Sequence, residues 1–190
     1  MPKVSSNRIS LFLLGLVMIS LAAVAESKGR LTYQTVHGAG LEDNLLGDSP
    51  NRQVMVYLPP SYTTTPTKRY PTIYLLHGYN GTSTIWRDGA YKGFNILTAM
   101  DELIEAGKIR EMIVVMPDGR NAYGGTYFVN SSVTGNWEDF VTQDLVSYID
   151  TTYRTIPGSA SRGVAGQSMG GYSAIYIAMK NPMSSAPSSQ

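Results

Sequence analysis

The alternation of apolar and polar positions is clearest at Gln53–Leu58, a segment that ends at Pro59-Pro60. This pattern predicts a half-buried strand that the prolines terminate, and Leu31–Val36 is a candidate to pair with it. Two continuous apolar runs follow, at Thr72–Leu76 and Met112–Met116. Short runs of this kind are typical of central parallel strands that are covered on both faces.

Segments with apolar residues at helical spacing lie between these two runs and after them. The residues from Ile96 to Ile104 recur at that spacing, and Gly107 stands where a left-handed C-terminal cap is expected. A second helix is predicted from Asn136, a suitable N-cap, to about Tyr153. The first of these segments therefore predicts a crossover helix between two parallel strands.

The last third of the chain repeats the pattern. A short strand is predicted at Arg162–Gly166 and a helix at Met169–Lys180. Four apolar residues of this helix are expected to pack: Ile175, Ile177, Ala178 and Met179. Strands that alternate with helices predict an α/β fold with a mostly parallel sheet flanked by helices and right-handed crossovers.

The pattern of the N-terminal segment predicts a signal peptide. Lys3 and Arg8 precede the apolar run Leu11–Val24, and Ala23-Val24-Ala25 is a small-x-small cleavage pattern. The alternative is a membrane anchor, but the run is shorter than the roughly 20 residues that span a bilayer. We expect cleavage after Ala25, a secreted or periplasmic product, and no stable membrane insertion of the mature protein.

Composition supports one domain and excludes several classes of function. The 190 residues are 43% hydrophobic, which is enough for one core, and the net charge is +1 without a basic block. Nucleic acid is therefore not an expected partner. The chain has no cysteine, so disulfides and thiolate metal sites are excluded. We expect a signal peptide at 1–25, one domain at 26–183 and a disordered tail at 184–190.

The main candidate for chemistry is the segment Gly166-Gln167-Ser168-Met169-Gly170-Gly171. It matches the G-x-S-x-G elbow, in which a sharp turn between a strand and a helix exposes a serine nucleophile. A purely structural turn before a helix is the alternative. The predicted strand before Ser168 and the predicted helix after it favour the elbow, and the positive end of that helix would stabilise an oxyanion.

A second hydrogen-bond donor for an oxyanion is expected after an earlier strand. The segment His77-Gly78-Tyr79-Asn80-Gly81 directly follows the run Thr72–Leu76. The backbone N–H groups of Tyr79 and Met169 are the predicted pair of donors. The alternative is an ordinary turn in which His77 packs in the interior.

Four motifs together carry a family resemblance. They are Val56-Tyr57-Leu58-Pro59-Pro60-Ser61-Tyr62, Leu75-Leu76-His77-Gly78, Pro117-Asp118-Gly119-Arg120 and the segment around Ser168. In this order and spacing the chain resembles the bacterial esterase family that includes esterase D, feruloyl esterases and mycolyltransferases. The resemblance covers Leu31 to Pro182, and it implies an α/β-hydrolase fold and acyl-ester chemistry with no metal or organic cofactor.

The chain departs from that family after Ser168. A serine nucleophile needs a base, normally a histidine oriented by a carboxylate, and in this fold both follow the serine. No histidine, aspartate or glutamate lies between Ser168 and Gln190, and the two histidines, His37 and His77, are upstream. We therefore expect an impaired triad and missing C-terminal strands. The abrupt change after Pro182 suggests a frameshift, a premature stop or a truncated gene model.

Residues for a substrate pocket come from a long Gly/aromatic loop, Asn121–Trp137, which follows a predicted strand at the edge where α/β sheets bind ligands. Tyr123 and Trp137 from this loop, with His77 and Gln167, are the candidates for an acyl or sugar pocket. The alternative is that the loop aromatics pack the loop onto the sheet.

Three functions stay open. The first is a secreted carboxylesterase that acts through an acyl-serine on small or carbohydrate-linked esters and is weakened by the absent base and acid. The second is a non-catalytic protein that kept the fold, with a separate C-terminal chain as a possible complement. The third is an acyltransferase that uses the same serine.

Overall fold

The computed structural model describes residues 28–180, so the predicted signal peptide and the predicted tail lie outside the described residues. The strands are β1 (Arg30–His37), β2 (Asn51–Leu58), β3 (Thr72–Leu76), β4 (Ile113–Pro117), β5 (Asn130–Ser131), β6 (Gly135–Asn136) and β7 (Arg162–Gly166). The main helices are α2 (Ile96–Glu105), α5 (Met169–Lys180) and a continuous helical segment made of α3 (Trp137–Asp139), η3 (Phe140–Asp144) and α4 (Leu145–Thr152). Short helical turns are α1 (Ser61–Thr64), η1 (Ala39–Leu41), η2 (Ser83–Trp86) and η4 (Ser159–Ser161). Within residues 28–180, no helix is both long and apolar enough to cross a membrane.

Five strands form one sheet in the order β1-β2-β4-β3-β7, and β5 and β6 form a separate two-stranded ribbon. β2 runs antiparallel to both β1 and β4, whereas β3 is parallel to both β4 and β7. The predicted pairing of Leu31–Val36 with Gln53–Leu58 is confirmed by the register of β1 and β2. The predicted parallel strands after them are confirmed as β3, β4 and β7, which makes this an α/β fold with a mixed sheet.

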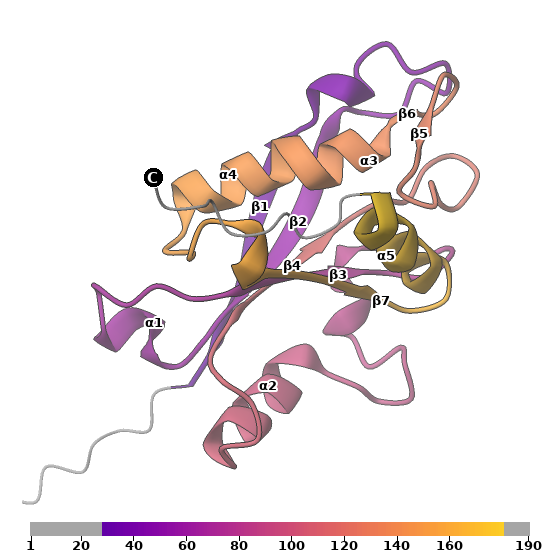
Figure 1. Cartoon of the computed structure of the whole chain (residues 1–190). Coiled ribbons are helices and arrows are strands. Elements are labelled where there is room, and N and C mark those ends of the chain that lie inside the picture. The colour runs from indigo at the N-terminus through magenta and orange to yellow at the C-terminus, as the bar shows by residue number, and fades with distance from the viewer. Residues whose placement is uncertain (1–27, 181–190) are drawn as a thin grey trace, which may run out of the picture.

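Helices cover both faces of the sheet (Figure 1). On one face, α2 and η2 pack on Met55 and Tyr57. On the other face, Trp137, Phe140 and Leu145 of the helical segment α3–α4 share one cluster with Val54, Val56 and Leu58, whereas α5 packs on β3 and β7. The prediction of a half-buried strand at Gln53–Leu58 was therefore wrong. Every residue from Val54 to Leu58 is buried, because both sides of β2 lie under helices.

The helix that follows the Gly/aromatic loop is continuous from Trp137 to Thr152, with a π-helical segment, η3, between α3 and α4. Its predicted N-cap was Asn136, but that side chain makes no capping hydrogen bond. The capping oxygen is Asn130 Oδ1, which accepts hydrogen bonds from the N–H groups of Glu138 and Asp139 at 2.9 and 3.1 Å. The β5–β6 ribbon brings Asn130 beside the first turn, which sequence distance alone could not indicate.

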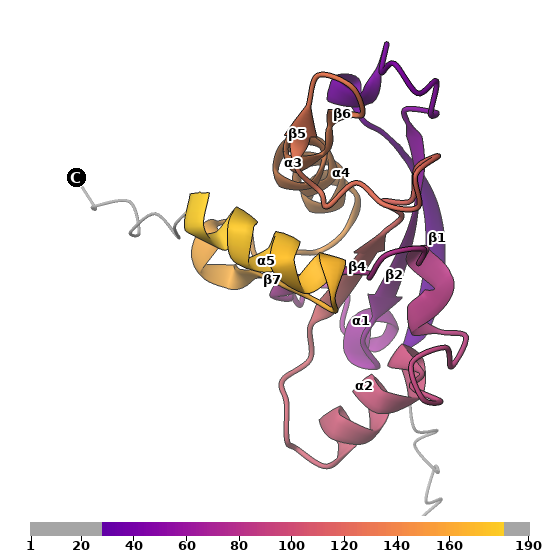
Figure 2. The same cartoon turned by 90° about the vertical axis from the view of Figure 1, so that its right-hand side faces the viewer.

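The terminal helix α5 packs through a different face from the one predicted. Its buried residues are Met169, Gly170, Ser173, Ala174 and Ile177. Of the four predicted packing residues only Ile177 is buried, whereas Ile175, Ala178 and Met179 are exposed. The glycine pair and Ser173 allow a close approach of the helix to β3 and β7, and this approach decides which face is covered. Figure 2 shows α5 beside β7 at the edge of the sheet.

Candidate active site

Ser168 lies between the end of β7 and the start of α5, as the elbow motif predicts. Its φ is +53°, in the left-handed region that side chains other than glycine rarely adopt. The turn is fixed by backbone hydrogen bonds: Gln167 N donates to Leu76 O at 3.2 Å, and Gly170 N donates to Gln167 O at 2.9 Å. Ser168 is exposed, and its hydroxyl makes no hydrogen bond with any described residue. Strain of this kind is typical of a functional residue that the surrounding backbone holds in place.

Two glycines permit this turn because their neighbours leave no room for a side chain. A Cβ on Gly166 would lie 2.4 Å from the carbonyl of Gly170, and one on Gly170 would lie 2.1 Å from Leu76 O. Real Cβ atoms do not approach backbone atoms so closely. The crowding comes from the start of α5, which passes over the end of β3.

The loop after β3 lies beside this elbow. Leu76 and Gly166 are paired in the parallel ladder, and a Cβ on Gly78 would meet Gln167 Oε1 at 2.3 Å. Two amides of the loop are already paired: Asn80 N donates to Gly124 O of the loop after β4 at 2.8 Å, and Gly81 N donates to Gly78 O at 3.0 Å. Within residues 28–180, the N–H groups of Tyr79 and Met169 donate to no carbonyl or side chain. Two unpaired amides on neighbouring loops are what oxyanion binding requires.

Gly125 separates the two residues that carry these amides. A Cβ at this glycine would lie 2.4 Å from Met169 Sδ and 3.3 Å from Tyr79 Cδ2. The loop after β4 therefore lies against both the elbow and the loop after β3. Three loops at the carboxyl ends of β3, β4 and β7 meet at one place, which is where α/β sheets position their ligands.

His77 is buried beneath the loops that form this site, and it lines neither of the two hollows beside the elbow. Its side chain is 0% exposed, and its ring links two loops: Nδ1 lies 2.7 Å from Gly78 O, and Nε2 lies 2.8 Å from Gly119 N. Because Gly119 N–H can only donate, Nε2 is the acceptor and Nδ1 carries the proton. Burial lowers the pKa of His77, and the Gly78 bond and Asp118 only partly oppose that shift. The histidine predicted as a pocket residue is a neutral bracket between the loops after β3 and β4.

Trp137 does not line the predicted pocket either. It is 1% exposed, its Nε1 donates to Thr134 O at 2.7 Å, and its ring packs on Phe128 and Phe140. The alternative in which the loop aromatics pack the loop onto the sheet therefore describes Trp137. By contrast, Tyr123 and Gln167 are exposed near the elbow and line separate hollows.

No described histidine can act as base for Ser168. His37 ends β1, at the opposite edge of the sheet, and four strand spacings of about 4.8 Å put it roughly 19 Å away. Its ring is held by Asn51 Oδ1 and Glu42 Oε1, each at 3.0 Å. His77 is buried and uses both ring nitrogens. Within residues 28–180, no group of three or more histidine, aspartate or glutamate side chains is arranged to hold a metal ion.

Two hollows have residues of the elbow, or of segments that contact it, in their linings. One, of about 420 Å³, lies against the Gly/aromatic loop and includes Tyr123, Tyr127 and Tyr172 in its lining. The other, of about 360 Å³, is lined by Gln167 and by side chains from the segment 86–94, Trp86 and Tyr91 among them.

Sequence reasoning missed two residues at this site. Tyr91 Oη accepts a hydrogen bond from Gly78 N at 3.1 Å, so it supports the loop that carries Tyr79, and no motif marks it. Tyr172 lies one helical turn after Ser168, and its N–H donates to Ser168 O at 3.0 Å. Helical spacing of i to i+4 from the serine was a signal that could have identified Tyr172.

A mixed sheet covered on both faces, with an exposed serine at positive φ between a parallel strand and a helix, defines the α/β-hydrolase class. Comparison with known proteins agrees. The chain belongs to the Esterase family: the family model, described as "Putative esterase", matches residues 49–184.

Three relatives illustrate the extent of the similarity. Esterase Rv1288 of Mycobacterium tuberculosis (strain ATCC 25618 / H37Rv) is 39% identical over 131 residues, which are 68% of this chain and 26% of that protein. The endo-1,4-beta-xylanase/feruloyl esterase of Xylanibacter ruminicola is 32% identical over 130 residues, which are 67% of this chain and 17% of that protein. A solved ferulic acid esterase matches with a TM-score of 0.71 at 26% identity, covering 84% of this chain and 56% of that one. This chain thus spans about a quarter of the mycobacterial relative.

Proposed function

We propose that this chain carries the nucleophile half of a secreted serine carboxylic-ester hydrolase. The observation that carries the proposal is the exposed Ser168, held at φ +53° between β7 and α5 beside the unpaired amides of Tyr79 and Met169. In the reaction, Ser168 Oγ forms a bond to the ester carbonyl carbon, and the two amides receive the oxyanion. Expulsion of the alcohol leaves an acyl-serine. Water then cleaves this ester to release the acid and restore the hydroxyl.

The general base is the catalytic group that the described residues do not supply. Ser168 must lose its proton as it attacks, and neither His37 nor His77 is placed to take it. Loss of the base in a serine hydrolase costs on the order of 10⁴- to 10⁶-fold in kcat. The proposal is therefore that hydrolysis by the chain alone is weak, and that a further polypeptide segment supplies the acid and the histidine.

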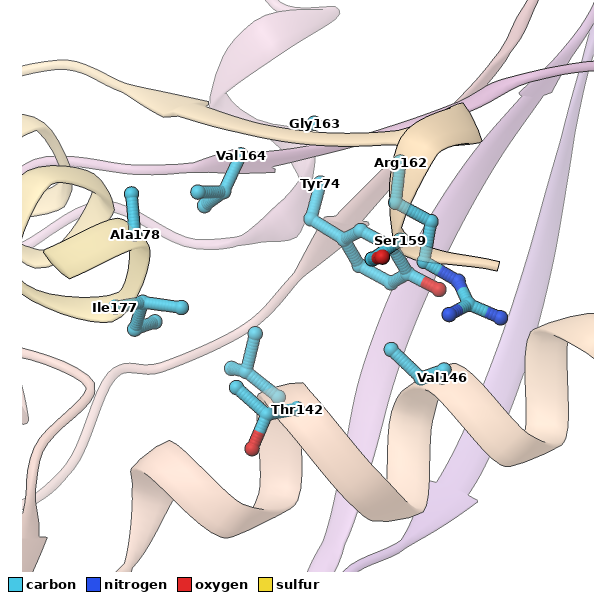
Figure 3. Close-up of a pocket in the computed structure, with 10 residues that line it drawn as sticks. Tyr74, Thr142, Val146, Ser159, Arg162, Gly163, Val164, Ile177 and Ala178 are labelled. Atoms are coloured by element: carbon cyan, nitrogen blue, oxygen red, sulfur yellow. The ribbon is translucent and has the colours of Figure 1, made fainter. Parts of the chain in front are cut away.

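The edge strand β7, which ends next to Ser168, is where we propose that this segment binds. β7 pairs only with β3 among the described strands, and a hollow of about 300 Å³ opens beside it between α4 and α5. Figure 3 shows Tyr74, Val164 and Ile177 around this hollow. Tyr74 Oη and Arg162 Nε are buried and have no hydrogen-bond partner among the described residues. An added strand would pair with β7, fill an apolar space and bring polar groups to these two atoms.

The first test is hydrolysis of p-nitrophenyl acetate by the purified protein, its Ser168→Ala variant and a control, Ser147→Ala. Ser147 is an exposed serine on α4, far along the chain from the elbow. A slow rate that falls to background in Ser168→Ala and not in Ser147→Ala supports the nucleophile. Equal rates in all three proteins mean that the chain alone is a non-catalytic protein with a hydrolase fold.

The second test supplies the absent base. The chain is co-expressed with the coding sequence that follows it in the genome, if this encodes a segment with aspartate and histidine. We expect hydrolysis to rise by several orders of magnitude, on the order of 10⁴-fold, and to need Ser168. A complex without Ser168-dependent hydrolysis would contradict the proposed mechanism. Methyl ferulate and p-nitrophenyl acetate, compared in that complex, test the aromatic ester that the names of two relatives suggest.

Secretion rests on the N-terminal segment alone. Lys3, Arg8 and the apolar run before Ala25 support export and cleavage. N-terminal sequencing of the protein recovered outside the cytoplasm should start at Glu26. Replacing Ala25 with a large residue should leave the precursor uncleaved. Recovery of the full-length protein in the cytoplasmic fraction alone would refute the proposal.

A further inference from the structure

The peptide unit that joins Gly78 to Tyr79 carries one of the two unpaired amides beside the elbow. Its carbonyl oxygen, Gly78 O, lies 2.7 Å from Nδ1 of the buried His77 ring and accepts a hydrogen bond from Gly81 N at 3.0 Å. In a planar trans peptide the C=O and N–H groups point in opposite directions. Because the carbonyl is held toward His77, the N–H of Tyr79 points away from that ring.

The other side of this peptide unit is held by the loop after β4. The Tyr79 hydroxyl donates to Tyr123 O, and Asn80 N donates to Gly124 O at 2.8 Å. The backbone at Asn80 turns through a φ of +59°, a left-handed value that asparagine adopts more readily than most residues. A side chain and a backbone amide from consecutive residues therefore bond to consecutive carbonyls of one neighbouring loop.

Two glycines of that loop leave room for the Tyr79 ring. A Cβ on Gly124 would lie 2.8 Å from Tyr79 Cζ, and a Cβ on Gly125 would lie 3.3 Å from Tyr79 Cδ2. The Cβ on Gly125 would also lie 2.4 Å from Met169 Sδ. A single glycine therefore contacts both of the residues that carry the unpaired amides.

The Tyr79 side chain is 54% exposed, yet its hydroxyl bonds to a backbone carbonyl. Ordering an exposed side chain costs conformational entropy, and a ring that stays half in water regains little of it through apolar burial. The hydrogen bond fixes the far end of the side chain, while the two glycines fix its flank. A ring held at these points also limits rotation of the backbone at its own Cα, so it orders the amide of the same residue.

From this geometry we infer that the side chain of Tyr79 is a positioning residue, which holds the N–H of Tyr79 in the orientation that receives the oxyanion. A donor that is already in place stabilises the transition state without a cost of reordering. The inference rests on the proposed function, since it assigns this amide to the reaction at Ser168. The order of the amide itself does not depend on that reaction and can be measured in the resting protein.

The first measurement is the NMR order parameter of the Tyr79 N–H, from backbone relaxation of the purified chain, in the original protein, Tyr79→Phe and Tyr79→Ala. The matched control is Tyr148→Phe, which removes a hydroxyl that donates to Gln34 Oε1 at 3.0 Å, on β1 at the opposite edge of the sheet from the elbow. We expect about 0.85 in the original protein and the control, and below about 0.6 in Tyr79→Ala. Tyr79→Phe keeps the ring on the two glycines and should give an intermediate value. Circular dichroism establishes that each variant is folded, and Tyr79→Phe alone decides if Tyr79→Ala does not fold.

The second measurement is Ser168-dependent hydrolysis of p-nitrophenyl acetate by the same four proteins. Because the oxyanion forms only as the reaction proceeds, a displaced amide should lower kcat and leave KM nearly unchanged. We expect kcat to fall about 30-fold in Tyr79→Ala and about fivefold in Tyr79→Phe, less than the roughly 10²- to 10³-fold cost of removing a donor outright. KM should change by about twofold or less, and Tyr148→Phe should match the original protein.

An unchanged order parameter of the Tyr79 N–H in the Tyr79 variants would overturn the inference. A loss of order that leaves the Ser168-dependent kcat intact would overturn it as well, because the amide would then take no part in the reaction. A rise in KM alone would assign the ring to substrate binding and would also contradict it. Loss of order in a protein without any Ser168-dependent hydrolysis would support the ordering of the amide by the ring and reject only the proposed function.

Discussion

The loop after β3 and the elbow after β7 start at paired residues, since Leu76 and Gly166 are neighbours in the parallel ladder. The first loop is held by a side chain: buried His77 bridges Gly78 O and Gly119 N. The second is held by the lack of side chains, because Gly166 and Gly170 allow α5 to contact the end of β3. The first loop has a neutral ring at its base, whereas the second exposes a strained serine.

This difference shows two ways to fix a loop at the edge of a sheet. A polar side chain that satisfies two backbone groups adds hydrogen bonds that water cannot replace in the interior. Glycines add no contact, but they permit a backbone path that any Cβ would block. The two loops should therefore respond differently to substitution, to pH and to relief of backbone strain.

The largest effect is expected at the elbow, for Gly170→Ala. The new Cβ would lie 2.1 Å from Leu76 O and 2.5 Å from Leu76 C, and both are backbone atoms that cannot rotate away. We expect a loss of about 3 kcal/mol in the free energy of unfolding, measured by urea denaturation. The matched control is Gly171→Ala, where the nearest atom, Gly166 O, is 3.3 Å away. The free energy of unfolding of this variant should stay within about 1 kcal/mol of that of the original protein. Equal losses in the two variants would contradict the steric explanation for Gly170.

A smaller loss of stability is expected for His77→Phe, which removes the side chain that links the loops after β3 and β4. Phenylalanine fills a similar volume but leaves Gly119 N–H without its acceptor and Gly78 O without its donor. Unfolding should become easier by about 2 kcal/mol. The other histidine provides the control, because His37 is exposed and His37→Phe removes only surface contacts, worth about 0.5 kcal/mol. Similar losses in the two variants would mean that the His77 bracket adds nothing specific.

The bracket should also make stability depend on pH. Burial lowers the pKa of His77 in the folded protein, whereas in the unfolded chain it stays near roughly 6.5. The unfolded chain thus binds more protons just below that pH, so this contribution is present above about pH 6.5 and is lost as the pH falls. Between pH 7.5 and 5.5 the free energy of unfolding should therefore fall, and the decrease is measured by urea denaturation at the two pH values. The fall should be smaller in His77→Phe, and an identical pH dependence in both proteins would contradict the buried neutral ring.

The smallest effect, and one of opposite sign, is expected for Ser168→Gly. Glycine adopts φ +53° without the steric cost that serine bears, although it also makes the unfolded chain more flexible. The net result should be a gain of about 0.5 kcal/mol in stability. In the control Ser147→Gly, an exposed helical serine, the same exchange should lose about 0.5 kcal/mol. A loss at Ser168 as well would show that its backbone is not strained.

Local pattern was enough to predict the elements that are buried or strongly periodic. The apolar runs at Thr72–Leu76 and Met112–Met116 became the central parallel strands, and Gly107 has the positive φ of the predicted cap. The elbow was also visible, because its glycines and serine are consecutive in the chain. In each of these cases the residues that decide the structure are close together in sequence.

The predictions failed where the deciding partner is distant. Asn130 and not Asn136 caps the helix, because the β5–β6 ribbon folds back onto its first turn. The face of α5 that packs is set by the approach of Gly170 to Leu76, which apolar periodicity does not report. Trp137 has the composition expected of a binding loop but is buried in the core.

The sequence by itself determined the class of fold, the family and the serine at the turn, because short motifs and buried strands impose their geometry locally. Only the tertiary structure decided that His77 is a bracket, that the Tyr79 hydroxyl bonds to Tyr123 O, and that Tyr79 and Met169 carry unpaired amides. Each of these facts depends on which loops meet at the carboxyl edge of the sheet. That meeting follows from the strand order β4-β3-β7, which brings together residues more than forty positions apart.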